Sequence, residues 1–453
     1  MIPVVTPDEM AAIDAAAPEP VEVLIERAGS AVARHAVDLL GGGYGRRVVV
    51  VHGKGNNGAD GRSAARRLRH RGVRVVEIDA TNAPGVLPPC DLVIDAAYGT
   101  GLQRDYVAAR LHDPTPVLAV DIPSGVDGRT GEVHGRPLAA TRTVTFAALK
   151  PGHLLEPGRS LCGDVRLADI GLDVSGASIH VVEAADVRGW LPRRPVDSHK
   201  WRSAVWAIAG SAGMTGAAHL TSAAAMRAGA GSVRLSTPGG GDDPAAPTEV
   251  VRVPIDRSVT IDIADTRRFG AMVVGPGLGR SPEVVDGVRR LVGDPKVESP
   301  LLIDGDGLSA LADSAAGVLS ARHGSTVLTP HEGELLVLGG PDPHHDRVAA
   351  VRELARRFGC IVLLKGPSTF VADPDGRVLV STVGDQRLAT AGTGDVLSGV
   401  IAAFLARGVP PFEAAAAGAY VHGCAAALGP FEGLVAGDLV SLLPRALARL
   451  EDD

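Results

Sequence analysis

The sequence predicts an α/β protein made of two domains, and three observations support this. First, 453 residues are enough for two or three domains, at roughly 150 residues per domain. Second, short β-branched runs alternate with helical patterns in both halves, which is typical of largely parallel sheets covered by helices. Third, the stretch WLPRRPVDSHKW, which begins at Trp190, combines two prolines with charge and has no periodicity. We therefore expect domains over residues 1–190 and 197–453.

The first half has five predicted strands. Between the first two, residues 62–72 fit a helix with a basic last turn that ends at Gly72. The N-terminal segment before them is helical and broken near Pro18 and Pro20. The predicted strands cover residues 46–53, 73–79, 91–99, 116–125 and 142–148.

The second half repeats this pattern with a helix over residues 217–229 and an Ala-rich, helical final third. No repeat of fixed period is present, so two domains are favoured over a repeat array. The predicted strands cover residues 204–211, 232–237, 271–277, 300–307, 324–331 and 360–366.

Composition excludes several classes of protein. A net charge of −7 and 3% aromatic residues argue against nucleic-acid binding. The apolar runs are all shorter than the ~18 residues that a membrane-spanning helix needs. The N-terminus lacks the basic and apolar regions of a signal peptide, and the four cysteines form no CxxC pair. We expect a cytoplasmic protein with reduced cysteines, no membrane partner and no cysteine-bound metal.

The segment GKGNNGADG, residues 53–61, follows the first predicted strand. Its glycines permit a tight turn, and the next helix then offers free N–H groups to an anion. The dinucleotide fingerprint GxGxxG is absent there. A plain loop is the alternative, but Asn56, Asn57 and Asp60 are more polar side chains than a simple turn requires.

Two further strands end in acids, Asp95 and Asp121. Ligands of open parallel sheets bind outside the carboxyl ends of the strands. Asn57, Asp95 and Ser124 are therefore candidate oxygen ligands for a hard cation, and Asp121 is a candidate for acid–base work. The alternative for each acid is a cap on the turn that follows it.

The strongest local signal is AGTGDVLSG, residues 391–399, followed by an apolar helix. A Gly-rich turn into a helix presents several N–H groups and the positive end of the helix dipole to a phosphate. Asp395 in this turn is placed to accept a proton from a substrate hydroxyl during phosphoryl transfer. A purely capping role for Asp395 is the alternative.

Other predicted strand ends carry matching groups. KGPST supplies Lys365, Gly366, Ser368 and Thr369 as phosphate ligands, and GPGLG (275–279) permits close approach of a ligand to the backbone. DGDG places Asp304 and Asp306 at a third strand end, and TPHEGE places His331 and Glu332 at a fourth.

Together these motifs resemble the bifunctional NAD(P)H-hydrate repair enzymes. In that family an epimerase domain precedes an ADP-dependent (S)-NAD(P)H-hydrate dehydratase domain. In the first half, GKGNNGADG, IDAAYGTGLQRD and DIPSGVDGRTG are similar to the epimerase pattern. In the second half, SHKW, GSAGMTGAA, AMRAGAGSVRL, GPGLG, TPHEGE, KGPST and ATAGTGDVLSG are similar to the dehydratase. The resemblance implies a Rossmann-like three-layer α/β/α first domain and a ribokinase-like second domain.

The resemblance also implies site residues. Asp121 and Asp395 would be catalytic, and both would contact substrate. The other residues implied to bind the hydrate in the first domain are Asn56, Asn57, Gly58, Ala59, Asp60, Gly99, Thr100, Gly101, Leu102, Gln103, Arg104 and Asp105. Those implied in the second domain are Ala217, Gly277 and His331. The implied nucleotide-binding residues are Lys365, Gly366, Pro367, Ser368, Thr369 and Gly394. The implied potassium ligands are Asn57, Asp95 and Ser124.

By this resemblance the chain would interconvert the R and S hydrates of NADH and NADPH and dehydrate the S form with ADP as co-substrate. We expect K⁺ in the first domain, Mg²⁺ with the nucleotide, small-molecule substrates and a homo-oligomer. The chain departs from the family in three places. Ala59 replaces the usual second Gly, DGDG replaces DADA, and GDQRLATAG lacks an Asn-Pro-Gly. These departures bear on local backbone shape and on nucleotide preference.

Two alternatives remain at this point. The second domain is also compatible with a ribokinase-like small-molecule kinase that releases a stable phosphorylated product. The first domain is also compatible with a non-catalytic module that binds a nucleotide or a protein and regulates the other half.

Overall fold

The chain divides into two units, and the division falls between Ile179 and His180. Residues 2–179 form the first unit, and residues 180–453 form the second together with Met1. The computed structural model describes residues 1–102 and 104–452. Residues 180–190, which we predicted as the end of the first domain, belong to the second unit, where Val187 is fully buried in the core.

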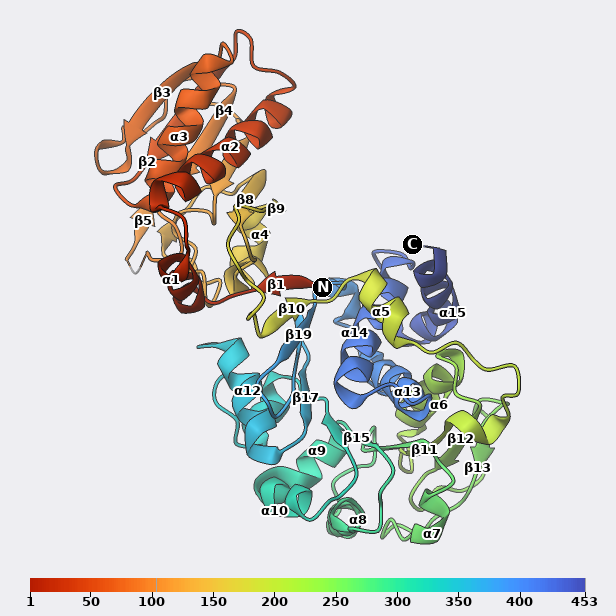
Figure 1. The fold of residues 1–453 in the computed structure, drawn as a ribbon. Coiled ribbons are helices and arrows are strands. Elements are labelled where there is room, and N and C mark those ends of the chain that lie inside the picture. The colour runs from red at the N-terminus through yellow and green to blue at the C-terminus, as the bar shows by residue number, and fades with distance from the viewer. Residues whose placement is uncertain (103, 453) are drawn as a thin grey trace. The chain divides into compact units, whose positions relative to one another are not determined.

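A parallel sheet forms the centre of the first unit (Figure 1). The five predicted strands are confirmed, and a sixth, β9, follows them. The strand order is β3-β2-β4-β6-β8-β9, and every pair is parallel. The strands are β2 (Arg47–His52), β3 (Arg74–Asp79), β4 (Leu92–Ala96), β6 (Val117–Val120), β8 (Arg142–Phe146) and β9 (Asp164–Ala168).

Helices α2 (Val21–Leu40) and α3 (Asn56–His70) pack on each other and share an apolar core with one face of this sheet. The predicted break near Pro18 and Pro20 is confirmed, because α1 (Pro7–Ala16) ends before these prolines and α2 begins after them. The other face of the sheet packs against a second apolar cluster that includes Leu87 and Tyr106. Shorter elements of this unit are β1 (Ile2–Val4), β5 (Tyr106–Val107), β7 (Gly135–Arg136) and α4 (Gly158–Cys162).

The turn from β2 into α3 differs from the sequence prediction. We expected the helix to begin at residue 62, but it begins at Asn56, so Asn56 to Asp60 form its first turns. Gly58 makes this possible, because a Cβ built on it would lie 2.0 Å from the carbonyl oxygen of Gly53. The helix start therefore comes against the end of β2, and its polar side chains lie at the edge of the sheet.

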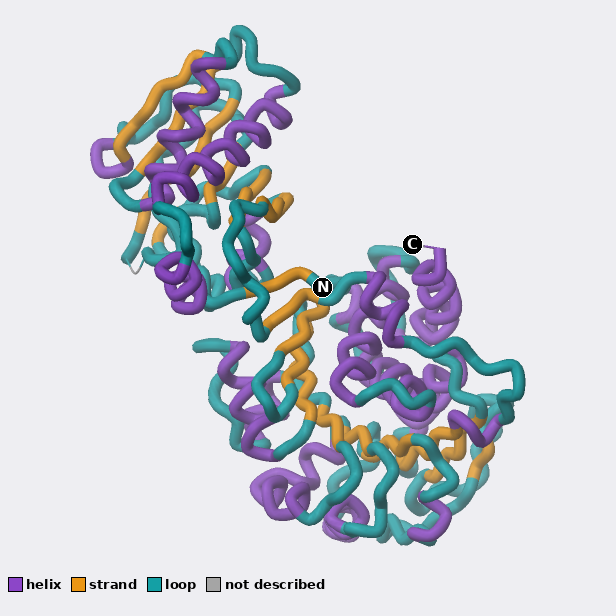
Figure 2. The backbone as a smooth tube through the Cα atoms, viewed as in Figure 1, coloured by secondary structure: helices purple, strands orange, loops and turns teal. Residues whose placement is uncertain are grey.

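The second unit also has a central sheet, which Figure 2 shows as an orange band between two groups of helices. Its order is β10-β19-β18-β17-β16-β15-β14-β11-β12-β13. The pairs from β17 to β13 are parallel, whereas β17, β18 and β19 pair antiparallel. The strands are β10 (Ile179–Val181), β11 (Ala204–Ile208), β12 (Ser232–Ser236), β13 (Val251–Arg252), β14 (Ala271–Val274), β15 (Leu301–Ile303), β16 (Thr326–Leu328), β17 (Ile361–Leu364), β18 (Thr369–Ala372) and β19 (Val378–Ser381).

Helices cover both faces of this second sheet (Figure 1). On one face, α13 lies between α6 and α14, and its Ala- and Gly-rich sequence permits close packing. This group is α5 (Ala184–Trp190), α6 (Thr215–Arg227), α13 (Thr393–Ala406), α14 (Pro411–Ala427) and α15 (Ala436–Asp452). The remaining helices are α7 (Ile263–Thr266), α8 (Pro282–Gly293), α9 (Asp306–Leu311), α10 (Ala315–Ser320), α11 (Glu332–Val337) and α12 (Arg347–Phe358).

All six strands predicted for the second half are present, and so is the predicted helix, as α6. The Ala-rich helices predicted for the final third are present as α13, α14 and α15, but the strands β18 and β19, which come between β17 and these helices in the chain, were not predicted. The short strand β13 was also missed. Among the described residues, no helix has both the length and the apolar character needed to cross a membrane.

Both sheets reverse their strand order once, and this positions the candidate sites. In the first sheet the chain moves from β2 outward to β3 and then returns to β4 on the other side. In the second it moves from β11 to β12 and then returns to β14. Such reversals open a crevice at the carboxyl ends of the strands, which is where α/β sheets bind ligands.

We predict that Gly58→Ala destabilises the first unit, because the new Cβ would overlap the carbonyl of Gly53 and the backbone must move apart. Overpacking of this kind costs roughly 1–3 kcal/mol. Thermal unfolding measures the effect. Gly85→Ala is the matched control, since nothing lies within 4 Å of its added Cβ. Equal unfolding midpoints for the two variants would contradict the close approach.

Candidate active sites

A cavity of about 670 Å³ in the first unit collects most of the predicted epimerase residues. It lies at the carboxyl ends of the strands and extends to α1 and α2. Gly58, Ala59, Asp95, Asp105 and Ser124 are not part of its lining, and Gln103 lies outside the described residues. The predicted residues that line it are Asn56, Asn57, Asp60, Gly99, Thr100, Gly101, Leu102, Arg104 and Asp121.

Asp121 is held by a buried lysine that the sequence analysis missed. Its Oδ1 accepts hydrogen bonds from the Lys150 ammonium at 2.6 Å and from the Thr145 hydroxyl at 2.9 Å. Lys150 is only 1% exposed. Asp121 itself has a left-handed backbone, with φ of 66°, which is uncommon for a non-glycine residue and concentrates at functional sites.

His153 completes this cluster through the backbone of Asp121. Its Nδ1 accepts the backbone N–H of Lys150 at 3.0 Å, so its Nε2 carries the proton and donates to the carbonyl oxygen of Asp121 at 2.8 Å. Burial lowers the pKa of His153 to about 4, with the nearby Lys150 charge acting in the same direction. His153 is therefore neutral and fixes the backbone of Asp121.

The carboxyl groups in this cavity have different electrostatic surroundings. Burial alone would raise the pKa of Asp121, but the charge and hydrogen bond of Lys150 outweigh it and hold that pKa below its usual value. Burial raises the pKa of Asp60 to about 8, and the negative charges of Asp121 and Asp14 add to the effect. One carboxyl is therefore ionised near neutral pH while its neighbour is mostly protonated.

Of the proposed cation ligands, Asn57 lines this cavity, whereas Asp95 and Ser124 are not part of its lining. Asp95 is 2% exposed, and its oxygens accept from the Ser124 hydroxyl at 2.6 Å and the Ser124 N–H at 2.9 Å. No basic side chain of the described residues forms an ion pair with Asp95. The amide oxygen and nitrogen of Asn57 are buried without a hydrogen-bond partner among the described residues. Buried polar groups of this kind are costly unless a ligand satisfies them.

Thr145, Lys150 and His153 were missed because they lie in β8 or after it and not in a glycine-rich turn. The available signal was the segment FAALKPGH, where a lysine interrupts an apolar run directly after a predicted strand. A buried lysine is rare unless it is paired. Asp14, which also lines the cavity, sits on α1 and gave no signal in the sequence.

The second candidate site surrounds the start of α13. Gly392 takes a left-handed conformation, with φ of 88°, and α13 then begins at Thr393. Asp395 therefore falls in the first turn, where backbone N–H groups have no intrahelical acceptor. This confirms the predicted turn into a helix at AGTGDVLSG.

Lys365 connects this helix start to two other strand ends. Its ammonium donates to Asp304 Oδ1 at 2.8 Å and lies 3.6 Å from Glu334 Oε2. Asp304 Oδ2 accepts from the Ser398 hydroxyl of α13 at 2.7 Å. A Cβ built on Gly394 would lie 3.6 Å from the Lys365 ammonium, so the residues that directly follow β15 and β17 meet the start of α13 here.

Charges in this cluster shift its pKa values. Burial raises the pKa of Asp395 to about 6, the charge of Asp304 adds to this, and the charge of Lys365 partly opposes it. Burial would lower the pKa of Lys365, but the charges of Asp304 and Glu334 outweigh burial and raise it. Lys365 therefore stays cationic, and Asp395 is poised to gain or lose a proton near neutral pH.

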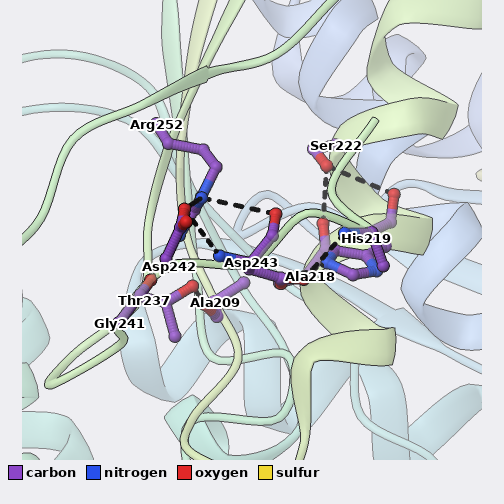
Figure 3. A network of polar contacts seen from close by, with 10 residues as sticks. Ala209, Ala218, His219, Ser222, Thr237, Gly241, Asp242, Asp243 and Arg252 are labelled. Carbon is purple, nitrogen blue, oxygen red and sulfur yellow. Dashed lines mark hydrogen bonds and ion pairs between the residues drawn. The ribbon is translucent and has the colours of Figure 1, made fainter. Parts of the chain in front are cut away.

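Gly277 and Ala217 come together at the reversal point of the second sheet. A Cβ built on Gly277 would lie 2.8 Å from the Ala217 Cβ. Next to Ala217 on α6, His219 bonds to Asp243 Oδ2 at 2.7 Å, and Arg252 bonds to Asp242 Oδ1 at 3.2 Å (Figure 3). This network fixes the segment after β12 against the start of α6.

His331 and the KGPST segment lie at neighbouring strand ends. His331 begins α11 and accepts the backbone N–H of Glu334, while its side chain remains 60% exposed. Arg347 donates to the carbonyl oxygen of Lys365 at 2.6 Å and also bonds to Glu332. It therefore stabilises the turn of Gly366, Pro367 and Ser368, after which β18 begins at Thr369. Arg347 had no predicted role.

Comparisons with known proteins cover both units. The family model described as NAD(P)H-hydrate dehydratase matches residues 205–447, and the model of the YjeF-related protein N-terminus matches residues 21–83 and 76–152. A bifunctional NAD(P)H-hydrate repair enzyme of Moorella thermoacetica is 36% identical and covers 99% of this chain and 97% of its own length. That of Mycobacterium leprae is 40% identical, over 94% of this chain and 95% of its own length.

Solved structures match the second unit. An ADP/ATP-dependent NAD(P)H-hydrate dehydratase of Bacillus subtilis, co-crystallised with ATP and Mg²⁺, is 30% identical with a TM-score of 0.52, over 59% of this chain and 97% of that one. A ribokinase-like superfamily protein of Enterococcus faecalis, 23% identical with a TM-score of 0.53 over 60% of this chain and 96% of that one, shares the fold. The matches do not favour a kinase with a regulatory first domain. The chain belongs to the family of bifunctional NAD(P)H-hydrate repair enzymes.

Proposed function

We propose that this chain repairs hydrated NADH and NADPH in two steps on one polypeptide. The first unit interconverts the R and S hydrates, and the second dehydrates the S hydrate with ADP, which yields NAD(P)H, AMP and phosphate. The observation that carries this proposal is the presence of two separate strand-end sites in a chain that matches bifunctional repair enzymes over nearly its whole length.

The dehydratase site is suited to activating a poor leaving group. The hydrate bears a hydroxyl on C6 of the nicotinamide ring, and hydroxide leaves poorly whereas phosphate leaves well. In our proposal Asp395 takes the hydroxyl proton while the oxygen attacks the terminal phosphorus of ADP and AMP departs. The ring nitrogen then expels phosphate from C6, and loss of a C5 proton restores the double bond.

Nucleotide binding in the second unit would use charge and backbone donors. Lys365 stays cationic at the start of α13, where Gly394 leaves space for a phosphate to approach the N–H groups. Gly366, Pro367, Ser368 and Thr369 would continue this contact, while Ala217, Gly277 and His331 would face the hydrate. The described residues contain no group of three or more His, Cys, Asp or Glu side chains that could hold a metal.

Mg²⁺ fits this site as a companion of the nucleotide. It is usually held by phosphates with one or two carboxylates and several waters, and Asp304 and Glu334 offer carboxylates beside Lys365. When bound, Mg²⁺ would neutralise phosphate charge.

K⁺ fits the first unit through Asn57, Asp95 and Ser124. The buried Asp95 carboxylate has no cationic partner among the described residues, and the Asn57 amide oxygen is buried without a donor. Oxygen donors of this kind suit a hard cation. When bound, K⁺ would supply positive charge next to the segment from Gly99 to Leu102.

The epimerase reaction needs acid–base chemistry at C6. C6 carries both the hydroxyl and the ring nitrogen, so the hydrate is a hemiaminal that can open to an aldehyde and close again on the other face. Asp121 is ionised in the cavity and would take the hydroxyl proton. The other lining residues, including Asn56, Thr100 and Arg104, would bind the remainder of the dinucleotide.

We further propose that the chain acts as a cytoplasmic homo-oligomer. None of the four cysteines, all of which lie among the described residues, forms a disulfide, as expected in a reducing compartment. The family's small-molecule substrates require neither a membrane nor a nucleic acid.

We predict that Asp395→Asn abolishes ADP-dependent loss of the S hydrate while the chain stays folded, because the amide cannot accept the hydroxyl proton. NADH formation from purified S hydrate and ADP measures this, with circular dichroism as the check on folding. Loss of a catalytic base lowers the rate by roughly 10²–10⁴-fold. Near-normal dehydration by the variant would remove Asp395 as the base.

Dehydration should also depend on pH through Asp395, whose raised pKa is about 6. The base works only when ionised, so kcat/KM for the S hydrate should be level above pH 7. Below pH 6 it should fall about tenfold per pH unit. The profile is measured with the ADP concentration saturating. A profile that stays flat down to pH 5 would contradict this assignment.

We predict that Asp121→Ala blocks conversion of R to S hydrate and leaves dehydration of the S form unchanged, because the two sites lie in separate units. Chromatography of the two epimers measures the first activity, and NADH formation measures the second. Unchanged epimerisation would return Asp121 to a structural role.

A further inference from the structure

Two carboxyl groups, Asp60 and Asp121, line the same cavity in the first unit but differ in their partners. Asp121 accepts hydrogen bonds from Lys150 and Thr145. Asp60 is 8% exposed, and no hydrogen bond to its side chain is formed by the described residues. One cavity therefore holds a carboxyl that is paired with a cation and a carboxyl that is not.

Lys150 forms its hydrogen bonds with Asp121 and with groups close to it. Its ammonium donates to Asp121 at 2.6 Å and to the Thr145 hydroxyl at 2.9 Å, and lies 3.4 Å from the carbonyl oxygen of Phe146. Lysine is almost never fully buried unless it is paired, and here the pairing partner faces the cavity. Through these bonds Lys150 fixes both the charge and the direction of the Asp121 carboxylate.

The backbone also holds both carboxyls in place. Asp60 lies in the first turns of α3, two residues after Gly58. The close approach of Gly58 to Gly53 holds these turns against the end of β2. Asp121 is fixed in its left-handed conformation by the hydrogen bond from His153 to its carbonyl oxygen. Neither position depends on a long loop.

We propose that Asp60 is the acid that protonates the ring nitrogen during epimerisation, and that Lys150 is the positioning residue that keeps Asp121 as the base. The proposal rests on the epimerase function proposed above. The buried lysine pairs with only one of the two carboxyls, so the two groups can take different roles in the reaction.

The step balances as a proton transfer without redox chemistry. Asp121 removes the proton of the C6 hydroxyl, the C6–O bond becomes a carbonyl, and the C6–N1 bond breaks with its electron pair moving to N1. Asp60 gives its proton to N1. Closure on the opposite face of the aldehyde reverses each transfer, so both carboxyls return to their starting states and the configuration at C6 is inverted.

The charges around the two groups support this division. The pKa of Asp60 is raised to about 8 by burial and by the charges of Asp121 and Asp14, whereas Lys150 outweighs burial and lowers the pKa of Asp121. The charged and titratable groups that face the pair are Asp14 of α1, Glu19 before α2, Arg104 of the loop after β4, and Lys150 and His153 after β8.

The test compares Asp60→Asn and Lys150→Met with Arg142→Met in the full chain, with purified R hydrate and potassium present. Arg142 provides a matched control, because it lies at the opposite end of β8 and pairs with Asp38 and Asp164 outside the cavity. Dehydration of the S hydrate by the same samples reports on the second unit, and thermal unfolding reports on the first. The readouts are kcat, KM and the pH profile of epimerisation.

Asp60→Asn should lower kcat roughly 100-fold or more with a small change in KM. It should also abolish the fall in rate that we expect of the wild type above about pH 8. Lys150→Met should lower kcat and move the acidic limb of the profile to higher pH, because Asp121 loses its cation. Lys150→Arg, which keeps the charge, should restore the limb toward its original pH. Arg142→Met should match the wild type.

Wild-type kinetics in Asp60→Asn would overturn its role as the acid. An unmoved acidic limb in a folded Lys150→Met would overturn the positioning role. If Lys150→Met does not fold, the test uses Lys150→Arg. An acidic limb in that variant at a pH far above that of the wild type would overturn the positioning role. A wild-type chain that leaves the R hydrate unconverted would overturn the epimerase function itself, so the two failures are distinguishable.

Discussion

A carboxylate buried at the end of a parallel strand must be matched by a positive charge or take up a proton, and both sites depend on this constraint. In the first unit Lys150 pairs with Asp121, and in the second Lys365 pairs with Asp304. Each lysine follows the end of a strand and reaches the end of another strand. Each leaves a second carboxyl, Asp60 or Asp395, with a raised pKa. Breaking a buried pair of this kind typically costs about 3–5 kcal/mol.

The topology explains why such pairs can form. Parallel order places all carboxyl ends at one edge of the sheet, so residues far apart in sequence, such as Asp304, Lys365 and Ser398, meet without long loops. The reversal of strand order opens the crevice there, and a helix start adds backbone donors. In the function proposed above, the two units use the same arrangement for different chemistry, since the first moves protons at the C6 hydroxyl and the ring nitrogen and the second transfers a phosphoryl group.

The strand ends were predictable from the sequence, because β-branched runs mark buried parallel strands and polar motifs mark where they stop. Thus Asp121, directly after β6, and Asp395, in the first turn of α13, lie where the pattern indicated. Lys150 was not predictable in the same way, because nothing in its neighbours shows that it is buried or which acid it meets. The helical start at Asn56 depends on a contact between Gly58 and Gly53, which a local pattern does not reveal. The strands β18 and β19 were missed because the Ala-rich helices dominate that third of the chain.

The central claim is that one chain joins an epimerase to a dehydratase that expels phosphate. The most direct measurement is incubation of the full chain with a mixture of R and S hydrates, ADP, Mg²⁺ and potassium, with all products identified. The account predicts that both epimers disappear and that NADH and AMP form in equal amounts. A stable phosphorylated hydrate, or an R hydrate left intact after the S form is consumed, would contradict it.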